Sequence, residues 1–429
     1  MPARRTAAGL AVAAMMIGSF AGGIGLPVPA WWPGACAWLA GALLLPALTR
    51  FQAMQAALMS LVGILGIAWA GAHGDRSWWP GLRDGNHALL AMLAAVSFLR
   101  PVTASGVSDE PLPRGRRAVL ETLAATHLFG AVINISAPVL VGERIAPRRG
   151  MTPLQAKTIS RAFVAASMWS PFFIAMALIL HYVPNARLPV ISGLGFTASA
   201  LMMAYCAVTL TRDPSAADFT GYPLHWRALW PPVLLSACVL SGHALLPELS
   251  VLVLIEGAAL GVTLAVLLLR RPRETGALLA RHVRERLPDM RGEFAMFLGA
   301  AVMTAGIGAA MGLTDVVLAP TSFGPGTAAV LLAALILLAV IGVHPVVCIS
   351  VLAGLWPFAR YDGNLLGAVF LLAWGLGLVI SPFSGTSLVF QGRFGLRTMD
   401  LLRFNLAYVG LGYGIGVALL YGYARWAAA

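Results

Sequence analysis

The sequence predicts an all-α polytopic membrane protein, and three observations carry this prediction. Of its 429 residues, 59% are hydrophobic and 11% are charged, whereas soluble domains carry roughly 25% charged residues. Apolar runs recur from end to end, and their length is close to the ~20 residues that a helix needs to cross the hydrocarbon core. No run alternates as barrel strands do, and backbone polar groups in lipid must be satisfied within their segment, so we expect helices.

The net charge of +12 would suggest a nucleic-acid partner in a soluble protein. Arginine also collects in the cytoplasmic loops of membrane proteins, and this second interpretation fits the apolar chain, so we predict no nucleic-acid partner. The cysteines lie in apolar segments without metal or redox spacing. We therefore predict no cofactor and no metal site. The four positions are Cys36, Cys206, Cys238 and Cys348.

The N-terminal segment resembles a signal peptide, since Arg4 and Arg5 precede an apolar stretch that ends near Val28-Pro29-Ala30. The apolar run is longer than a usual signal-peptide core, and Pro29 is poorly placed just before a cleavage site. We interpret residues 1–31 as an uncleaved N-terminal transmembrane helix.

Charge decides how many of the apolar stretches cross the membrane. With the N-terminus inside and the stretches 119–142 and 326–357 returning to the side they entered, all but five of the 29 Lys and Arg residues face the cytoplasm. We therefore predict two re-entrant hairpins, eleven crossings, a cytoplasmic N-terminus and a periplasmic C-terminus in a bacterial inner membrane. The apolar stretches are 8–28, 32–48, 52–71, 86–100, 119–142, 152–182, 187–210, 228–247, 249–269, 293–313, 326–357, 364–395 and 402–424.

Local patterns of the first half recur in the second half at a nearly constant offset, which indicates two repeats. The first repeat covers 32–210 and the second 228–424; residues 211–292 include the first two helices of the second repeat and a basic connector at 270–292. An odd number of crossings per repeat makes the copies inverted, as in many secondary transporters. The matched segments are Ala91–Val96 with Ala295–Val302, Ala131–Asn134 with Ala339–Gly342, and Ser170–Phe172 with Ser381–Phe383.

Each repeat contains a helix that proline interrupts, at Ser170-Pro171 within 152–182 and at Ser381-Pro382 within 364–395. Proline removes an amide donor, so we expect unpaired carbonyls at these breaks. Such carbonyls and the nearby hydroxyls suit a cation or a polar solute, and the following half-helix favours an anion. A kink closed by its own hydroxyls is the alternative. The second break adds Ser384, Gly385, Thr386 and Ser387.

The two hairpin tips complete the predicted site. The first tip offers Asn134 and Ser136 before Pro138, and the second offers His344 before Pro345. A histidine inside a membrane protein can titrate near neutral pH and is a functional candidate, with a packing role as the alternative. Glu256 lies in the middle of an apolar span, so we expect it to be protonated or paired across helices.

Two inverted five-span repeats, each with a hairpin followed by a broken helix, resemble the ion transporter superfamily, which includes divalent-anion/sodium symporters. In those symporters a Ser-Asn-Thr triad at each tip helps to bind sodium and carboxylates. Here the tips read Asn134-Ile135-Ser136 and Gly342-Val343-His344. Carried over by position, the resemblance implies that the first tip and Ser170 form one half-site, and that His344 and the second break form the other.

These features predict a secondary active transporter of a small polar, anionic solute, driven by a proton or sodium gradient, and not an enzyme. An ion/proton antiporter or exporter, an intramembrane enzyme and a membrane assembly subunit are the alternatives. The predicted partners are the solute, the coupling ion and the lipid bilayer, and the sequence also allows a homodimer.

Overall fold

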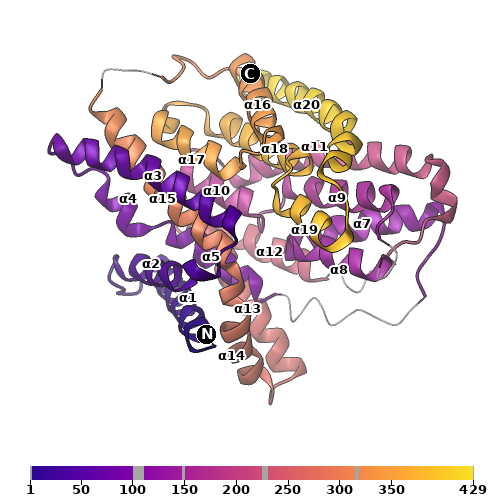
Figure 1. Cartoon of the computed structure of the whole chain (residues 1–429), viewed down its shortest axis with the longest axis horizontal. Helices are drawn as coiled ribbons and strands as arrows, with labels where there is room; N and C mark the ends of the chain where they lie inside the picture. The colour runs from indigo at the N-terminus through magenta and orange to yellow at the C-terminus, as the bar shows by residue number, and fades with distance from the viewer. Residues whose placement is uncertain (1, 100–110, 147–149, 225–229, 315–317, 429) are drawn as a thin grey trace. The chain divides into compact units, whose positions relative to one another are not determined.

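A computed structural model describes residues 2–99, 111–146, 150–224, 230–314 and 318–428. These residues form helices and no strand (Figure 1), which confirms the predicted all-α class. The helices of ten or more residues are α1 (Pro2–Gly23), α2 (Trp32–Leu44), α3 (Arg50–Ala72), α5 (His87–Ser97), α7 (Arg116–Ile133), α8 (Ser136–Ile145), α9 (Pro153–Ser167), α11 (Leu188–Thr211), α12 (Trp230–Leu245), α13 (Val251–Arg270), α14 (Thr275–Glu285), α15 (Arg291–Gly312), α16 (Pro325–Val340), α17 (Pro345–Leu355), α18 (Gly363–Ile380), α19 (Gly385–Phe394) and α20 (Thr398–Ala428). The shorter ones are α4 (Trp79–Asp84), α10 (Ile174–Tyr182), and the 3₁₀ turns η1 (Leu45–Ala47), η3 (Pro214–Asp218), η5 (Leu287–Met290) and η6 (Phe358–Arg360).

Seven described helical stretches are long and apolar enough to cross a membrane. The chain is therefore a multi-pass membrane protein. The predicted crossing at 152–182 is divided into α9, with 15 residues, and α10, with 9 residues. Each of these is shorter than the ~20 residues of a full span. The count of eleven crossings and the orientation stay predictions.

The chain divides into two compact units, and each draws on both predicted repeats. Unit 1 comprises Met1–Ser105, Leu235–Pro320 and Val346–Pro357. Unit 2 comprises Gly106–Leu234, Thr321–Pro345 and Phe358–Ala429. The early helices of both repeats thus lie in unit 1, and the hairpin α7–α8 and both broken helices lie in unit 2.

Within unit 1, α3 and α15 approach each other backbone to backbone. A Cβ added to Gly63 would lie 2.2 Å from the Val302 carbonyl oxygen, and one added to Gly306 would lie 1.9 Å from the Gly63 oxygen. Small residues allow such close packing between membrane helices. In the same unit α13 packs against α5 and α1, and α14 packs against α1.

Unit 2 is built around α18. This helix is apolar on all sides, and nearly every residue from Gly363 to Ile380 is buried, as expected for a helix without a polar face. It packs against α9, α10, α11, α16 and α20. The two broken helices, α9–α10 and α18–α19, therefore lie in the same packed core.

The helix contacts of unit 2 follow the same order in both predicted repeats. In the first repeat α9 packs against α7 and α11; in the second, α18 packs against α16 and α20. The two sets also exchange equivalent contacts, because α11 packs against α18 and α20 packs against α9. This pattern is what two copies of one arrangement would produce.

The prolines at the two hairpin tips lie after the turns and not within them. Pro138 is in the first turn of α8, and Pro345 is the first residue of α17. A helix start tolerates proline because the amide at that position has no partner inside the helix. Within the basic connector 270–292, α13 continues to Arg270, and α14 and η5 follow.

Candidate functional site

The first hairpin tip and the first helix break are joined by hydrogen bonds. Asn134 is the C-cap of α7, with a φ of 51° and a ψ of −136°, a positive-φ conformation that lies outside the left-handed α region and that side chains rarely adopt. Its Nδ2 donates to the Phe172 carbonyl oxygen over 3.0 Å. Ser170 Oγ donates to the Ala131 oxygen and accepts from the Phe172 amide. The tip and the break thus form one polar cluster in unit 2, and its role as a half-site stays a prediction.

Both ring nitrogens of His127, beside this cluster, have a hydrogen-bond partner. Its Nδ1 lies 3.1 Å from the Ala162 carbonyl oxygen, and its Nε2 lies 3.1 Å from Trp169 Nε1. A carbonyl requires a donor at Nδ1, and the indole N–H requires an acceptor at Nε2. The contacts therefore select the neutral Nδ1–H tautomer. Ser192 Oγ donates to the Trp169 carbonyl oxygen, which ties the same break to α11.

At the second break, side-chain hydroxyl and amide groups donate hydrogen bonds to the backbone carbonyls near Pro382. Pro382 offers no N–H to Leu378, and Ser384 Oγ donates to the Leu378 oxygen over 2.7 Å. Ser387 Oγ donates to the Ser381 oxygen over 2.7 Å, and Asn405 Nδ2 lies 3.4 Å from the Val379 oxygen. The expectation of unpaired carbonyls is wrong for these three groups. The alternative, a kink closed by its own hydroxyls, describes the Leu378 and Ser381 carbonyls, whereas the donor to Val379 comes from α20 and could not be found from the local pattern.

The polar groups that remain at this break are amides. Ser384 is the N-cap of α19, and its Oγ accepts from the Ser387 amide over 3.1 Å. The amides of Gly385 and Thr386, the first two of α19, have no acceptor within the helix. Nothing lies within 4 Å of the position that a Cβ would take at Gly385. A helix N-terminus beside open space can hold an anion.

The second tip contacts the second break through an aromatic ring. Gly342 has a φ of +96°, and a Cβ there would lie 2.4 Å from Cδ2 of Phe383. The predicted repeat aligns Gly342 with Asn134, so both tips turn through a residue of positive φ at the same place. His344 lies edge-on to Trp374 of α18, with ring centroids 5.6 Å apart.

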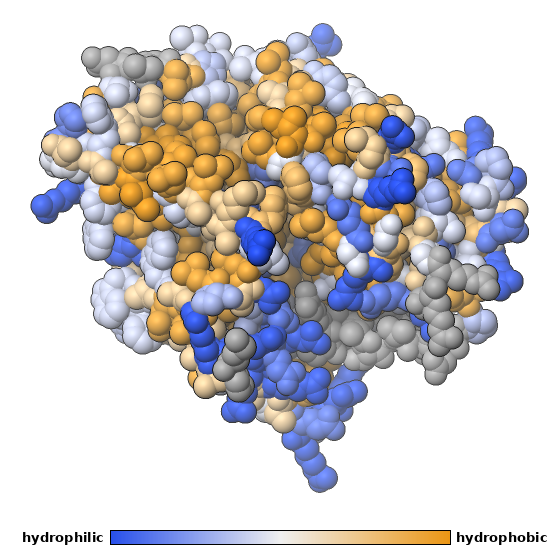
Figure 2. Space-filling model, viewed as in Figure 1, coloured by the Kyte–Doolittle hydropathy of each residue, from blue (hydrophilic) through white to orange (hydrophobic). Residues whose placement is uncertain are grey.

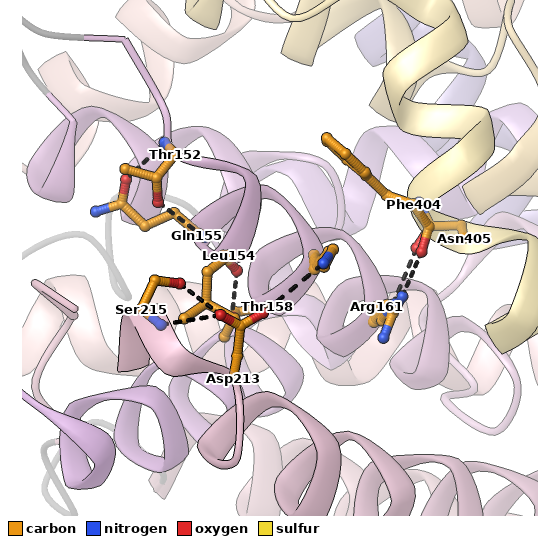
Figure 3. A network of polar contacts seen from close by, with 10 residues as sticks. Thr152, Leu154, Gln155, Thr158, Arg161, Asp213, Ser215, Phe404 and Asn405 are labelled. Atoms are coloured by element: carbon orange, nitrogen blue, oxygen red, sulfur yellow. Dashed lines mark hydrogen bonds and ion pairs between the residues drawn. The ribbon is translucent and has the colours of Figure 1, made fainter. Parts of the chain in front are cut away.

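A buried arginine lies close to the second break. Arg161 of α9 is 5% exposed; its Nε donates to Asn405 Oδ1 over 3.0 Å, and its Nη2 donates to the Phe404 oxygen (Figure 3). The guanidinium also lies 5.1 Å from the centre of the Tyr408 ring. No described carboxylate forms an ion pair with it. Because Asn405 also reaches Val379, this cation is two hydrogen bonds away from the break.

The contacts between α9 and α18 show how far apart the two breaks lie along the helix axis. A Cβ at Gly375 of α18 would lie 2.6 Å from Cγ of Met168, and Met168 is the C-cap of α9. Gly375 precedes Ser381 by six residues, or about 9 Å at 1.5 Å per residue. The Asn405 bridge from Arg161 to Val379 indicates that α9 and α18 run antiparallel. Ser170 lies about 3 Å beyond Met168 in the opposite axial direction, so the two breaks lie roughly 12 Å apart along the helix axis.

The structure places the predicted site residues in two groups. Asn134 and Ser170 contact each other's segments directly, and Ser136 begins α8 two residues after Asn134. Ser381, Ser384, Thr386 and Ser387 are buried together around the second break. Pro171 and Pro382 lie in the two interruptions, between α9 and α10 and between α18 and α19.

Sequence reasoning missed Arg161, its partner Asn405, and the hydrogen bond between His127 and Trp169. The signal for Arg161 was present, since a cation inside an apolar helical pattern is a functional candidate. Its partner on α20 could not be found from spacing. In unit 1, Glu256 is 1% exposed, and its Oε1 has no hydrogen-bond partner among the described residues. This favours the protonated form over pairing across helices.

Comparison with known proteins adds a likeness of fold. No protein-family model and no curated protein matches the sequence. Among solved structures, the chain is similar to the YdaH transporter of Alcanivorax borkumensis, with 16% sequence identity and a TM-score of 0.49. The match covers 93% of this chain and 99% of that one. In the part of the chain that the structure describes, no group of three or more His, Cys, Asp or Glu residues is placed to hold a metal ion.

Proposed function

We propose that this chain is a secondary transporter that moves a small polar anion across the membrane, driven by a proton or sodium gradient. The observation that carries the proposal is the arrangement in unit 2. Two broken helices pack in one core, and at each break a tip residue with positive φ lies against the interruption. Broken helices from inverted repeats form the midplane sites of many secondary transporters.

Two features of the second break favour an anionic solute. The free amides of Gly385 and Thr386 stand at the positive end of α19 beside open space. Arg161 carries a buried positive charge that no described carboxylate balances, and it is linked to the same break through Asn405. A buried charge without a partner is costly, so an anion that enters this core lowers the free energy of the loaded state.

The second tip provides the candidate for coupling to protons. His344 lies at the turn between α16 and α17 and against Trp374. Burial disfavours the charged form of an imidazole, whereas a bound anion favours it, so anion binding and protonation of His344 would be coupled. If protons couple transport, His344→Gln should flatten the pH dependence of flux. If sodium couples transport, the substitution should leave that dependence unchanged, and flux should follow the sodium gradient.

The proposal is tested with purified protein in liposomes and a panel of carboxylates, sugar acids and oxyanions under imposed proton or sodium gradients. Gly385→Val fills the space in front of the α19 amides and should abolish uptake. Gly392→Val is the matched control, because Gly392 lies in the same helix and also has nothing within 4 Å of its Cβ position. No uptake of any panel member, or equal loss in both variants, would reject the proposal.

A further inference from the structure

A polar cavity of about 590 Å³ lies in unit 1, where α1 begins and α14 ends. It is separate from the helix breaks, which belong to unit 2. Its lining residues come from the first turns of α1, the last turn of α14, and the η5 segment. They are Arg5, Thr6, Arg284, Glu285, Arg286 and Asp289.

The charges around the cavity do not balance. Asp289 pairs with Arg5 at 2.6 Å and lies 3.9 Å from Arg286, so one carboxylate serves two guanidinium groups. Glu285 lies 3.3 Å from Arg281, on the preceding turn of α14. Arg284 forms no ion pair with any described residue. The cavity therefore holds positive charge in excess, in the form of guanidinium groups, which bind phosphate oxygens in a bidentate manner.

These groups are held in place by the packing of α14. His282 is buried and lies 2.8 Å, through Nε2, from Ser97 Oγ of α5. A Cβ at Gly9 of α1 would lie 2.0 Å from the Val283 carbonyl oxygen, so α1 and α14 touch along their backbones. Arg5 Nη2 donates to the Glu285 carbonyl oxygen over 2.8 Å, which joins the start of α1 to the end of α14.

Exposed leucines on α1 and at the end of α13 favour a lipid as the ligand. Leu10 is 56% exposed and lies one helical turn beyond Thr6 on the same face of α1. The last turn of α13, which packs against α1 and α14, exposes Leu268 and Leu269 directly before Arg270. Figure 2 shows hydrophilic side chains gathered over α14 at the lower edge of the view. Cationic groups beside exposed leucines match the boundary between headgroups and acyl chains.

We propose that this cavity binds the phosphate of an anionic phospholipid. Its chemistry is that of a phosphodiester held by Arg284 and Arg286, with the acyl chains along Leu10 and the end of α13. The hydroxyl of Thr6 lines the same cavity and can donate to a phosphate oxygen. Free inorganic phosphate shares the headgroup chemistry but gains nothing from the leucines.

The proposal is tested by native mass spectrometry of the full chain, which counts retained lipids after release from nanodiscs of phosphatidylglycerol or of phosphatidylcholine. We expect the wild type to retain phosphatidylglycerol preferentially. Arg284→Gln should weaken this retention roughly fivefold, the effect of one basic residue near an anionic surface. Arg273→Gln is the matched control, because Arg273 is exposed on the same connector and does not line the cavity.

A second variant keeps the test informative if Arg284→Gln folds poorly. Glu285→Gln removes a negative charge from the lining and should strengthen phosphatidylglycerol retention, a gain that misfolding cannot produce. Equal retention of both lipids, an equal loss in Arg273→Gln, or weaker retention in Glu285→Gln would overturn the proposal. Displacement of the lipid by millimolar inorganic phosphate would also overturn it, since the site would then be one for soluble phosphate.

Discussion

We expect Ser384 to stabilise the second break strongly, because its hydroxyl makes two hydrogen bonds there. It donates to the Leu378 oxygen over 2.7 Å, and it accepts from the Ser387 amide over 3.1 Å. Ser384→Ala leaves a buried carbonyl without a donor, at about 1–3 kcal/mol, and removes an N-cap, at about 0.5–2 kcal/mol. Since one side chain makes both contacts, we expect a loss of about 2–4 kcal/mol in the local stability of the break.

Hydrogen exchange of the amides of residues 379–388, measured on the purified protein, reports this local stability. Protection in Ser384→Ala should fall by about two orders of magnitude or more, following the ~1.4 kcal/mol that corresponds to each factor of ten. Ser160→Ala is the matched control. Ser160 is 3% exposed, and its Oγ donates to the Ala156 oxygen, but that carbonyl keeps its backbone partner inside α9. Its loss should be below about 1 kcal/mol.

A double-mutant cycle with Pro382→Ala tests the cause. Alanine at this position restores an amide that can reach the Leu378 carbonyl, so the hydroxyl of Ser384 should matter less in that background. We expect a coupling of about 1–2 kcal/mol between the two substitutions. Additive effects, or equal losses in Ser384→Ala and Ser160→Ala, would refute the reasoning that Ser384 replaces the missing amide.

Three further predictions follow from other parts of the chain. Asn405→Asp places a carboxylate against Arg161 and cancels its charge. A unit charge about 10 Å away contributes about 1.7 kcal/mol at an effective dielectric constant of ~20, so the KM for the anionic solute should rise roughly tenfold. An unchanged KM would show that the solute does not interact with this cation. The hydrogen bond from the Ser215 hydroxyl lowers the pKa of Asp213 from its usual value. This contact therefore stabilises the fold above the unfolded-state pKa of Asp213 and loses its effect as pH falls through the folded-state pKa. The stability difference between wild type and Ser215→Ala should shrink on acidification, and a difference that grows would contradict the assignment. Asn185 Nδ2 donates to the Ala359 oxygen, so cysteines at Asn185 and Arg360 must react from the same side of the membrane, which we predict to be the outside; a cysteine at Gly276 should not react there, and its labelling from outside would refute the topology.

Much of the fold could be predicted because its signals are local. The apolar runs gave helices, and Pro171 and Pro382 marked the two interruptions, since a missing amide acts on the turn that precedes it. The positive φ of Asn134 and of Gly342 was not predicted, although a glycine such as Gly342 adopts a positive φ readily. The lengths of α8 and α19 were less certain, because a helix of about ten residues depends on its tertiary contacts.

The site could be predicted only in part because its partners are distant in sequence. Ser384 caps the break from within the next turn, which a pattern of Ser, Pro and Gly can suggest. Asn405 reaches the Val379 carbonyl from a different helix, and Asn134 reaches Phe172 from the hairpin. Such pairings depend on how helices pack, and one sequence does not determine this. The division into units has the same origin, since each unit joins segments from both repeats.

The two proposed half-sites share a positive-φ tip residue beside a helix break and differ in the contacts that join tip to break. In the proposed carrier, this difference would affect alternating access. Asn134 and Ser170 fasten the first tip to its break by hydrogen bonds to the Phe172 and Ala131 carbonyls. The Gly342 backbone of the second tip packs against the Phe383 ring, and that side chain is 43% exposed. Separating the first pair exposes buried carbonyls that need new donors, at about 1–3 kcal/mol each, whereas a partly exposed ring loses only a fraction of a phenylalanine's burial energy. In a carrier built on this core, the second tip is therefore the one that separates from its break at the lower free energy.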